Sequence, residues 1–191
     1  MSVILASQSP RRQELLRRMG LEEFEIRPAQ GEETVPPGLT VAQQVEELSR
    51  QKAREVAAGA GPGDIIIAAD TVVAVDDRVL GKPQSEQQAV EMLARLSGRS
   101  HKVYTGLTVC RDGVERTQHE CTQVVFRTLT AHEIRAYVQT REPMDKAGAY
   151  GIQGRGCVLV EGIQGDYYNV MGLPVCRLAL MLREFGVEVI K

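Results

Sequence analysis

The feature that most constrains this chain is a short apolar run, residues 65–69, that is followed directly by an acidic residue. A run of this length is too short for a buried helix and is typical of a central strand that is covered on both faces. Asp70 follows where this strand is expected to end, and the open ends of strands in α/β sheets collect ligands. The sequence therefore predicts a buried strand that fixes the position of one carboxylate.

Helical and extended patterns alternate along the rest of the chain. Helix starts are predicted at five signals, namely Ser9-Pro10, Thr40, Ser85, Thr130 and Pro174. Residues 103–129 alternate in polarity around an Asp-Gly turn, which predicts a long hairpin. Residues 24–40 carry no sustained period, and a final strand is expected over residues 187–190. The pattern predicts one α/β domain over residues 1–191, with a mixed sheet and two lobes around a central cleft.

Composition limits the partners that this chain can have. The 191 residues are 43% hydrophobic, which is enough for one sizeable core, and the formal net charge is -2. A protein that coats nucleic acid normally carries a basic excess, so no nucleic-acid partner is expected. No apolar run approaches the length of a membrane span, about 20 residues, and the apolar start lacks a basic leader. We therefore expect a cytoplasmic protein that makes no contact with a membrane.

Cysteine and histidine do not form a metal or redox motif in this sequence. The four cysteines are widely and unevenly spaced, so none forms the close pair of a zinc ribbon or a thioredoxin-like site. The three histidines lack metal-ligand spacing and are interpreted as structural.

The first helix start has the chemistry of an anion site. Arg11 and Arg12 lie in its first turn, beside the backbone N–H groups that a helix start leaves unpaired. Arginine adds planar donors that suit phosphate oxygens. Cations at a helix start are mildly unfavourable against the helix dipole, and this local cost favours a bound anion over two ordinary surface arginines.

Two lysines, a glutamate and a glycine-rich segment are further candidates. Lys82 is held between a glycine and a proline, which suits a fixed phosphate contact, whereas Lys52 on a helix would ordinarily be solvated. Glu33, in an acidic pair, is also consistent with a solvated turn. Residues 145–154 are rich in glycine around Gln153, which suits a loop whose backbone closely approaches a flat ligand.

The candidate residues fall within motifs that follow one another in a fixed order. These are Leu5-Ala6-Ser7-Gln8-Ser9-Pro10-Arg11-Arg12, Glu33, Gln51-Lys52-Ala53, Ala69-Asp70-Thr71-Val72-Val73, Gly81-Lys82-Pro83, Leu96-Ser97-Gly98-Arg99, Glu142-Pro143-Met144-Asp145-Lys146-Ala147-Gly148-Ala149-Tyr150-Gly151-Ile152-Gln153-Gly154 and Asn169-Val170-Met171-Gly172-Leu173-Pro174. In this order they resemble the Maf family of nucleotide pyrophosphatases over nearly the whole chain. The Gly-Ala-Tyr-Gly-Ile-Gln-Gly form is similar to the dTTP/UTP branch rather than the 7-methyl-GTP branch.

The resemblance implies a fold, a reaction and a set of site residues. The fold is mixed α/β, related to the inosine triphosphate pyrophosphatases, with a cleft between two lobes. The reaction is hydrolysis of a nucleoside triphosphate between its α and β phosphates with a divalent cation, Mg2+ or Mn2+, and homodimers are frequent in the family. By position, Asp70 matches the family's proton acceptor. The substrate-specificity positions match Arg12, Thr71 and Gln153, and further pocket positions match Ser9, Glu33, Lys52 and Lys82.

The resulting hypothesis is a house-cleaning hydrolase that acts on dTTP, UTP and modified pyrimidine nucleotides. An aspartate acting alone is a poor base for water at neutral pH, and a divalent ion held by Asp70 and Glu33 removes that demand. Two alternatives stay open: a pyrophosphatase for 7-methyl-GTP or damaged purine triphosphates, and a nucleotide-sensing module without turnover in division arrest. The presence of both carboxylates favours catalysis over binding alone.

Overall fold

The computed structural model describes residues 2–190, and this chain divides into two compact units. The first unit comprises the described residues up to Asp70, residues 105–120 and the residues from Gly172 onward. The second unit comprises residues 71–104 and 121–171. Each unit is discontinuous in sequence, because the chain passes between them within three long strands and once more between Met171 and Gly172.

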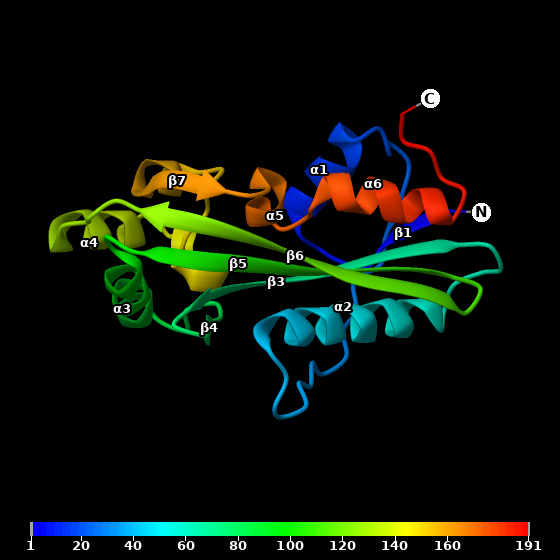
Figure 1. Ribbon diagram of the computed structural model, residues 1–191, viewed down its shortest axis with the longest axis horizontal. Coiled ribbons are helices and arrows are strands. Elements are labelled where there is room, and N and C mark those ends of the chain that lie inside the picture. Colours follow the sequence, from blue (N-terminus) through cyan, green and yellow to red (C-terminus); the bar gives the residue numbers. More distant parts are fainter. Residues whose placement is uncertain (1, 191) are drawn as a thin grey trace. The chain divides into compact units, whose positions relative to one another are not determined.

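The strands form one mixed seven-stranded sheet in the order β2-β1-β3-β5-β6-β7, with β4 paired to β3 beside this path. They are β1 (Val3–Leu5), β2 (Glu25–Ile26), β3 (Ile65–Val75), β4 (Arg78–Leu80), β5 (Ser100–Arg111), β6 (Val114–Phe126) and β7 (Val160–Gln164), drawn as arrows in Figure 1. Strand β1 pairs in parallel with β2 and β3, whereas the β3–β4 and β6–β7 pairs are antiparallel. The predicted mixed α/β class is confirmed.

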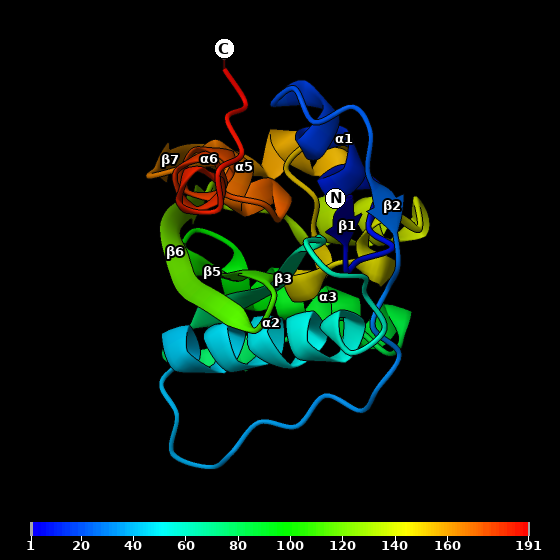
Figure 2. The same ribbon diagram turned by 90° about the vertical axis from the view of Figure 1, so that its right-hand side faces the viewer.

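Helices α1 (Pro10–Arg18), α2 (Val41–Ala57) and α6 (Val175–Glu184) belong to the first unit. Figures 1 and 2 show α1 and α6 on one side of the strands of this unit and α2 on the other. The hydroxyl of Ser9 accepts from the Arg12 amide at the start of α1, and Thr40 forms a capping box with Gln43 at the start of α2. The predicted starts of these helices are therefore confirmed, and for the reason expected, since each cap satisfies an unpaired N–H group.

Helix α2 packs very closely on the sheet. A Cβ atom at Gly106 of β5 would lie 2.0 Å from the backbone oxygen of Val45, which no side chain permits. Behind this contact, apolar residues of α2 and of the strands form one buried cluster: Ile4, Ala6, Ala53, Val56, Ile66, Ala68 and Cys110. The small residues Ala53, Ala68 and Gly106 let the helix backbone approach the strands closely.

The second unit contains α3 (Glu86–Leu96), α4 (Ala131–Gln139) and α5 (Tyr167–Met171) together with three short 3-10 helices. The 3-10 helices are η1 (Glu142–Asp145), η2 (Ala147–Ala149) and η3 (Arg155–Leu159). Helices α3 and α4 pack against each other. Ser85 caps α3 and Thr130 caps α4, as predicted.

Several predicted elements differ from those in the structure. Residues 187–190 were expected to form a strand but have no strand pairing, and residues 25–26 form β2 inside a segment that was expected to be irregular. The second hairpin strand ends at Phe126 rather than 129. A two-residue strand and single helical turns carry too little periodicity to be detected, because their pairing partners are distant in sequence. Among the described residues, no helix has the length and apolar character needed to cross a membrane.

A buried aromatic cluster in the second unit holds a histidine in its neutral form. The rings of His101, Phe126 and Tyr150 meet edge to face, with centroids 4.7 to 5.3 Å apart. The Nε2 atom of His101 lies 2.8 Å from the Tyr150 hydroxyl, while Nδ1 has no hydrogen-bond partner among the described residues. Burial lowers the pKa of His101 from 6.5 to about 4.

This histidine predicts a specific loss of stability in acid. Between pH 6.5 and about 4 the unfolded chain binds a proton at His101 that the folded chain does not, so the free energy of unfolding falls as the pH drops through this window. The loss attributable to His101 is about 3 kcal/mol and is absent above pH 6.5. In H101Q, which places an amide near the Tyr150 hydroxyl but does not titrate, the free energy of urea unfolding should show a shallower pH dependence. Equal slopes for the two proteins would contradict this role.

Candidate active site

Asp70 lies inside strand β3 on the face that α2 covers. The parallel pairing of β1 with β3 ends at Leu5 and Ile67, and β3 continues from there to Val75. Asp70 was predicted at the end of its strand. It lies instead within β3, just beyond the segment that pairs with β1, because β3 is longer than β1. Strand alternation places Asp70 on the same face as Ile66 and Ala68, and its side chain is largely buried.

The ammonium group of Lys52 joins two carboxylates. Its Nζ atom lies 2.6 Å from Oδ1 of Asp70 and 2.9 Å from Oε1 of Glu33. The Lys52 side chain is only 16% exposed and Asp70 only 13%, whereas Glu33 is 51% exposed. Lys52 is therefore not the solvated helical lysine that its position alone would suggest. The three residues come from a loop, a helix and a strand of the first unit, and they form one charged cluster.

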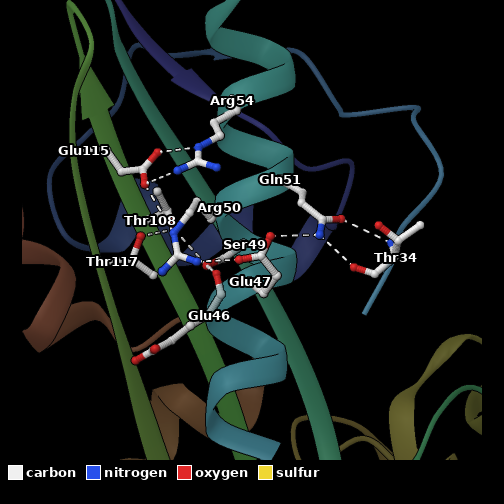
Figure 3. Close-up of polar contacts among 10 residues, drawn as sticks. All are labelled: Thr34, Glu46, Glu47, Ser49, Arg50, Gln51, Arg54, Thr108, Glu115 and Thr117. Carbon is white, nitrogen blue, oxygen red and sulfur yellow. Dashed lines mark hydrogen bonds and ion pairs between the residues drawn. The ribbon is translucent and has the colours of Figure 1, made fainter. Parts of the chain in front are cut away.

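Helix α2 also holds the segment that carries Glu33. The Gln51 amide accepts from the Thr34 N–H at 3.2 Å and donates to the Thr34 carbonyl at 2.7 Å. One helical turn further, the Glu55 carboxylate accepts from the N–H groups of Gln30 and Gly31. Figure 3 shows Gln51 turned toward Thr34, away from the side of α2 where Arg54 pairs with Glu115. These contacts hold the backbone on either side of Glu33 against the helix that carries Lys52.

The start of α1 forms a second cationic group. The Arg12 guanidinium donates through Nε to the Gly172 carbonyl at 2.8 Å and through Nη1 to the Ser7 hydroxyl at 3.1 Å. The Ser7 hydroxyl also accepts from the N–H of Ser9. Burial lowers the pKa of Arg12 and the neighbouring Arg11 acts in the same sense, while Asp70 and Glu33 oppose it. A guanidinium that is partly stripped of water, with no acidic residue in the first turn of its helix, favours an anionic ligand.

The remaining predicted residues belong to the second unit. Thr71 follows Asp70 in β3, Lys82 is exposed in the turn after β4, and Gln153 is exposed in the loop between η2 and η3. The turn of Lys82 is tied to the glycine-rich segment, because the N–H of Gly148 donates to the carbonyl of Gly81 at 3.1 Å.

The carboxylates of the first unit suit a hard divalent cation. Among the described residues no group of three or more acidic, histidine or cysteine side chains gathers to hold a metal. Mg2+ is usually bound by one or two carboxylates, with waters and substrate phosphates completing its shell. Asp70 and Glu33, which both contact the ammonium group of Lys52, are the two carboxylates that could hold such an ion.

Three positioning side chains, those of Ser7, Gln51 and Glu55, were not predicted from the sequence. Ser7 stands within the first motif, but nothing in that motif signals that its hydroxyl serves Arg12 rather than a ligand. Gln51 and Glu55 are spaced as one helix face, and this spacing is a usable signal only once the course of residues 30–34 is known.

Known proteins resemble this chain over nearly its whole length. A sequence model of the family described as Maf-like protein matches residues 2–185. The chain belongs to the Maf-like protein family. Curated relatives in this family include the dTTP/UTP pyrophosphatase of Moorella thermoacetica, which is 53% identical over 98% of this chain and 96% of its own length. The dTTP/UTP pyrophosphatase of Carboxydothermus hydrogenoformans is 52% identical over 97% of this chain and 100% of its own.

Solved structures share the fold of this Maf-like chain at low sequence identity. The Ham1 protein of Staphylococcus aureus superposes with a TM-score of 0.56 at 13% identity, covering 96% of this chain and 99% of its own. The HAM1 protein of Coxiella burnetii gives a TM-score of 0.52 at 17% identity, covering 96% and 99%. The prediction of a mixed α/β fold shared with other nucleotide pyrophosphatases is confirmed at the level of the fold, through these Ham1 proteins.

The Gln51 contact predicts a local change in dynamics. In Q51A the Thr34 N–H and carbonyl lose their partners, so amide hydrogen exchange in residues 30–35 should become about fivefold faster, equivalent to about 1 kcal/mol. Q44A is the matched control, because Gln44 donates to the Leu39 carbonyl from the same helix without touching residues 30–35. Exchange measured by mass spectrometry should separate the two variants. Equal rates in Q51A and the unaltered protein would show that Gln51 does not hold residues 30–35.

Proposed function

We propose that this protein hydrolyses dTTP and UTP to the nucleoside monophosphate and pyrophosphate. The observation that carries the proposal is 53% identity over 98% of the chain to a relative named dTTP/UTP pyrophosphatase. The charged cluster around Lys52 supports it, since a binding module without turnover has no need of two carboxylates about one buried ammonium. Modified pyrimidine nucleotides that present the same base edge belong to the same substrate class.

In this proposal the cations of the chain bind the triphosphate. Arg11 and Arg12 at the start of α1 bind phosphate oxygens. The Ser9 hydroxyl caps the helix by accepting from the Arg12 N–H, and so keeps the backbone there ordered. Lys52 and Lys82 stabilise the negative charge that develops on the departing pyrophosphate. Asp70, fixed by β3 and by Lys52, accepts the proton of the attacking water.

We further propose that the reaction uses Mg2+ or Mn2+ held by Asp70 and Glu33. A divalent ion supplies Lewis acidity toward phosphate oxygens and water. The residues of the chain provide the rest: Lys52 orients both carboxylates, and the partial burial of Asp70 keeps bulk water away from the reacting groups.

Base selection is proposed to depend on Gln153, with Arg12 and Thr71 as the other specificity positions. A carboxamide carries both a donor and an acceptor, which matches the O4 and N3–H edge shared by uracil and thymine. Cytosine presents the opposite pattern at this edge. We also propose that the protein acts in the cytoplasm and forms homodimers, as the family resemblance implies.

The products test the proposed reaction. Incubation with dTTP or UTP and a divalent cation should yield the monophosphate and pyrophosphate in one step, separated by ion-exchange chromatography. D70N keeps the shape of the side chain but removes its charge, so its kcat should fall by at least about 10²-fold. D76N is the control, because Asp76 pairs with Arg99 in a turn and should leave turnover unchanged. Release of the diphosphate and inorganic phosphate first would refute the proposed activity.

The choice of base tests Gln153. Losing its contact should cost about 1–3 kcal/mol of transition-state stabilisation for UTP and dTTP. Q153A should therefore lower kcat/KM for these two substrates much more than for CTP, and narrow the preference. Q87A, which removes an exposed amide from α3, is the matched control. An equal fall for all three triphosphates would show that Gln153 does not recognise the base.

A further inference from the structure

The loop that carries Gln153 folds around the carboxylate of Glu142. Oε1 of Glu142 accepts from the Tyr137 hydroxyl at 2.8 Å and from the N–H of Gly156 at 3.0 Å. Oε2 accepts from the N–H of Arg155 at 2.8 Å. The Tyr137 hydroxyl in turn accepts from the N–H of Gly151 at 3.1 Å. Two side chains therefore hold backbone groups on both sides of Gln153, and all of them lie within the second unit.

The glycines of this loop are required by these two side chains. A Cβ atom at Gly154 would lie 2.5 to 2.6 Å from the Glu142 carboxylate. At Gly156 it would lie 2.7 Å from the Tyr137 hydroxyl and 2.6 Å from the carbonyl of Gly151. The glycine-rich composition was predicted to allow close approach to a ligand; in the structure it allows close approach to the chain's own Glu142 and Tyr137.

The two side chains are themselves firmly placed. Tyr137 is buried on α4, and Glu142 begins η1 immediately after Arg141, whose φ of 65° turns the chain sharply. The ammonium of Lys146 donates to the backbone carbonyl of Glu142 at 2.6 Å. Lys146 thus holds the backbone of Glu142, while three donors hold its carboxylate. The position of Glu142 therefore does not depend on the loop alone.

The electrostatics keep both groups in the forms that these bonds need. Burial alone raises the pKa of Glu142, but the amides of Gly156 and Arg155 and the Tyr137 hydroxyl outweigh it, so this pKa lies below its usual value. Burial, together with the Glu142 charge, raises the pKa of Tyr137. At neutral pH Glu142 is an acceptor and Tyr137 keeps its proton as a donor.

We propose that Glu142, assisted by Tyr137, is the positioning residue that locks the Gln153 loop in the conformation that recognises a uracil or thymine edge. Gln153 can select one base edge only if its carboxamide lies at a fixed place relative to that edge, and this place is set by the backbone that carries it. Glu142 and Tyr137, which together we call the clamp, hold this backbone through the N–H groups of Gly151, Arg155 and Gly156. This role rests on the proposed function of Gln153.

The test combines selectivity with amide exchange. In E142Q the side-chain amide group faces one of the backbone N–H donors, which leaves that donor unsatisfied. The ratio of kcat/KM for UTP to that for CTP should fall about tenfold, through a higher KM for UTP, with kcat within about threefold of the unaltered protein. Amide exchange in residues 151–157 should become faster. Y137F, which deletes a single hydroxyl, should shift both readouts in the same direction and by less, and it serves if E142Q fails to fold.

The control is E133Q. Glu133 accepts from the Thr130 N–H and from Arg127 at the other end of α4, so this variant alters a comparable set of bonds to a carboxylate. Arg127 retains its separate bonds to the carbonyls of Val158 and Leu159. It should lower the melting temperature while leaving the UTP to CTP ratio and the exchange of residues 151–157 unchanged. A similar loss of selectivity in E133Q would show that E142Q acts through general stability, and would overturn the proposal.

The remaining outcomes separate this proposal from the function on which it rests. If exchange of residues 151–157 is unchanged in E142Q, the clamp does not hold the loop and the proposal is wrong, whatever the kinetics. If exchange becomes faster and Q153A loses selectivity while E142Q does not, the clamp has no part in base choice. If neither variant alters selectivity, the proposed role of Gln153 fails and the positioning role fails with it, while unchanged products in the nucleotide assay leave the reaction itself standing.

Discussion

The contact between helix α2 and strand β5 at Gly106 is the constraint on which the first unit depends. With no side chain at this position, the helix backbone rests directly on the strand, and a Cβ atom would stand 2.0 Å from the Val45 oxygen. This seat sets the height of α2 over the sheet, and with it the reach of Lys52 to Asp70 on one side and of Gln51 to Thr34 on another. The opposite flank is held by Arg54 and Arg50, which pair with Glu115 of β6 (Figure 3). A shift of the helix by one ångström would alter all of these distances together.

The charges in the resulting cluster are shared among several side chains and are not paired one to one. Lys52 is shared by Asp70 and Glu33, and Arg12 is held by a hydroxyl and a carbonyl, both uncharged acceptors. Burial of a carboxylate is costly unless it is paired, and Lys52 is the partner of Asp70. The charges of Asp70 and Glu33 also act on Arg12 and oppose the effect of its burial. Two carboxylates, one ammonium group and one guanidinium group therefore gather in one unit of the chain.

The second unit uses a different device to order a loop. Its glycine-rich segment has no regular strand or long helix, yet its backbone N–H groups are satisfied by a carboxylate and a phenol that stand among them. Buried or half-buried backbone donors must find acceptors, and when secondary structure does not supply them side chains do. Such a loop can present an exposed amide such as Gln153 with little freedom, which a simple flexible loop could not. Glycine here serves compactness rather than mobility.

Local chemistry in the sequence determined the elements whose causes are local. The run at residues 65–69 identified the buried strand, the caps at Ser9, Thr40, Ser85 and Thr130 identified the helix starts, and the order of the motifs identified the family. The individual site residues could be named because their motifs are contiguous. Tertiary structure alone decided which contacts they make. Lys52 was indistinguishable from a solvated lysine until α2 was seated on Gly106, and Glu142 carried no signal because its partners lie up to 14 residues away across a turn. Hydrogen-bond and ion-pair distances between separate segments depend on packing, and packing is not encoded in any single stretch of the chain.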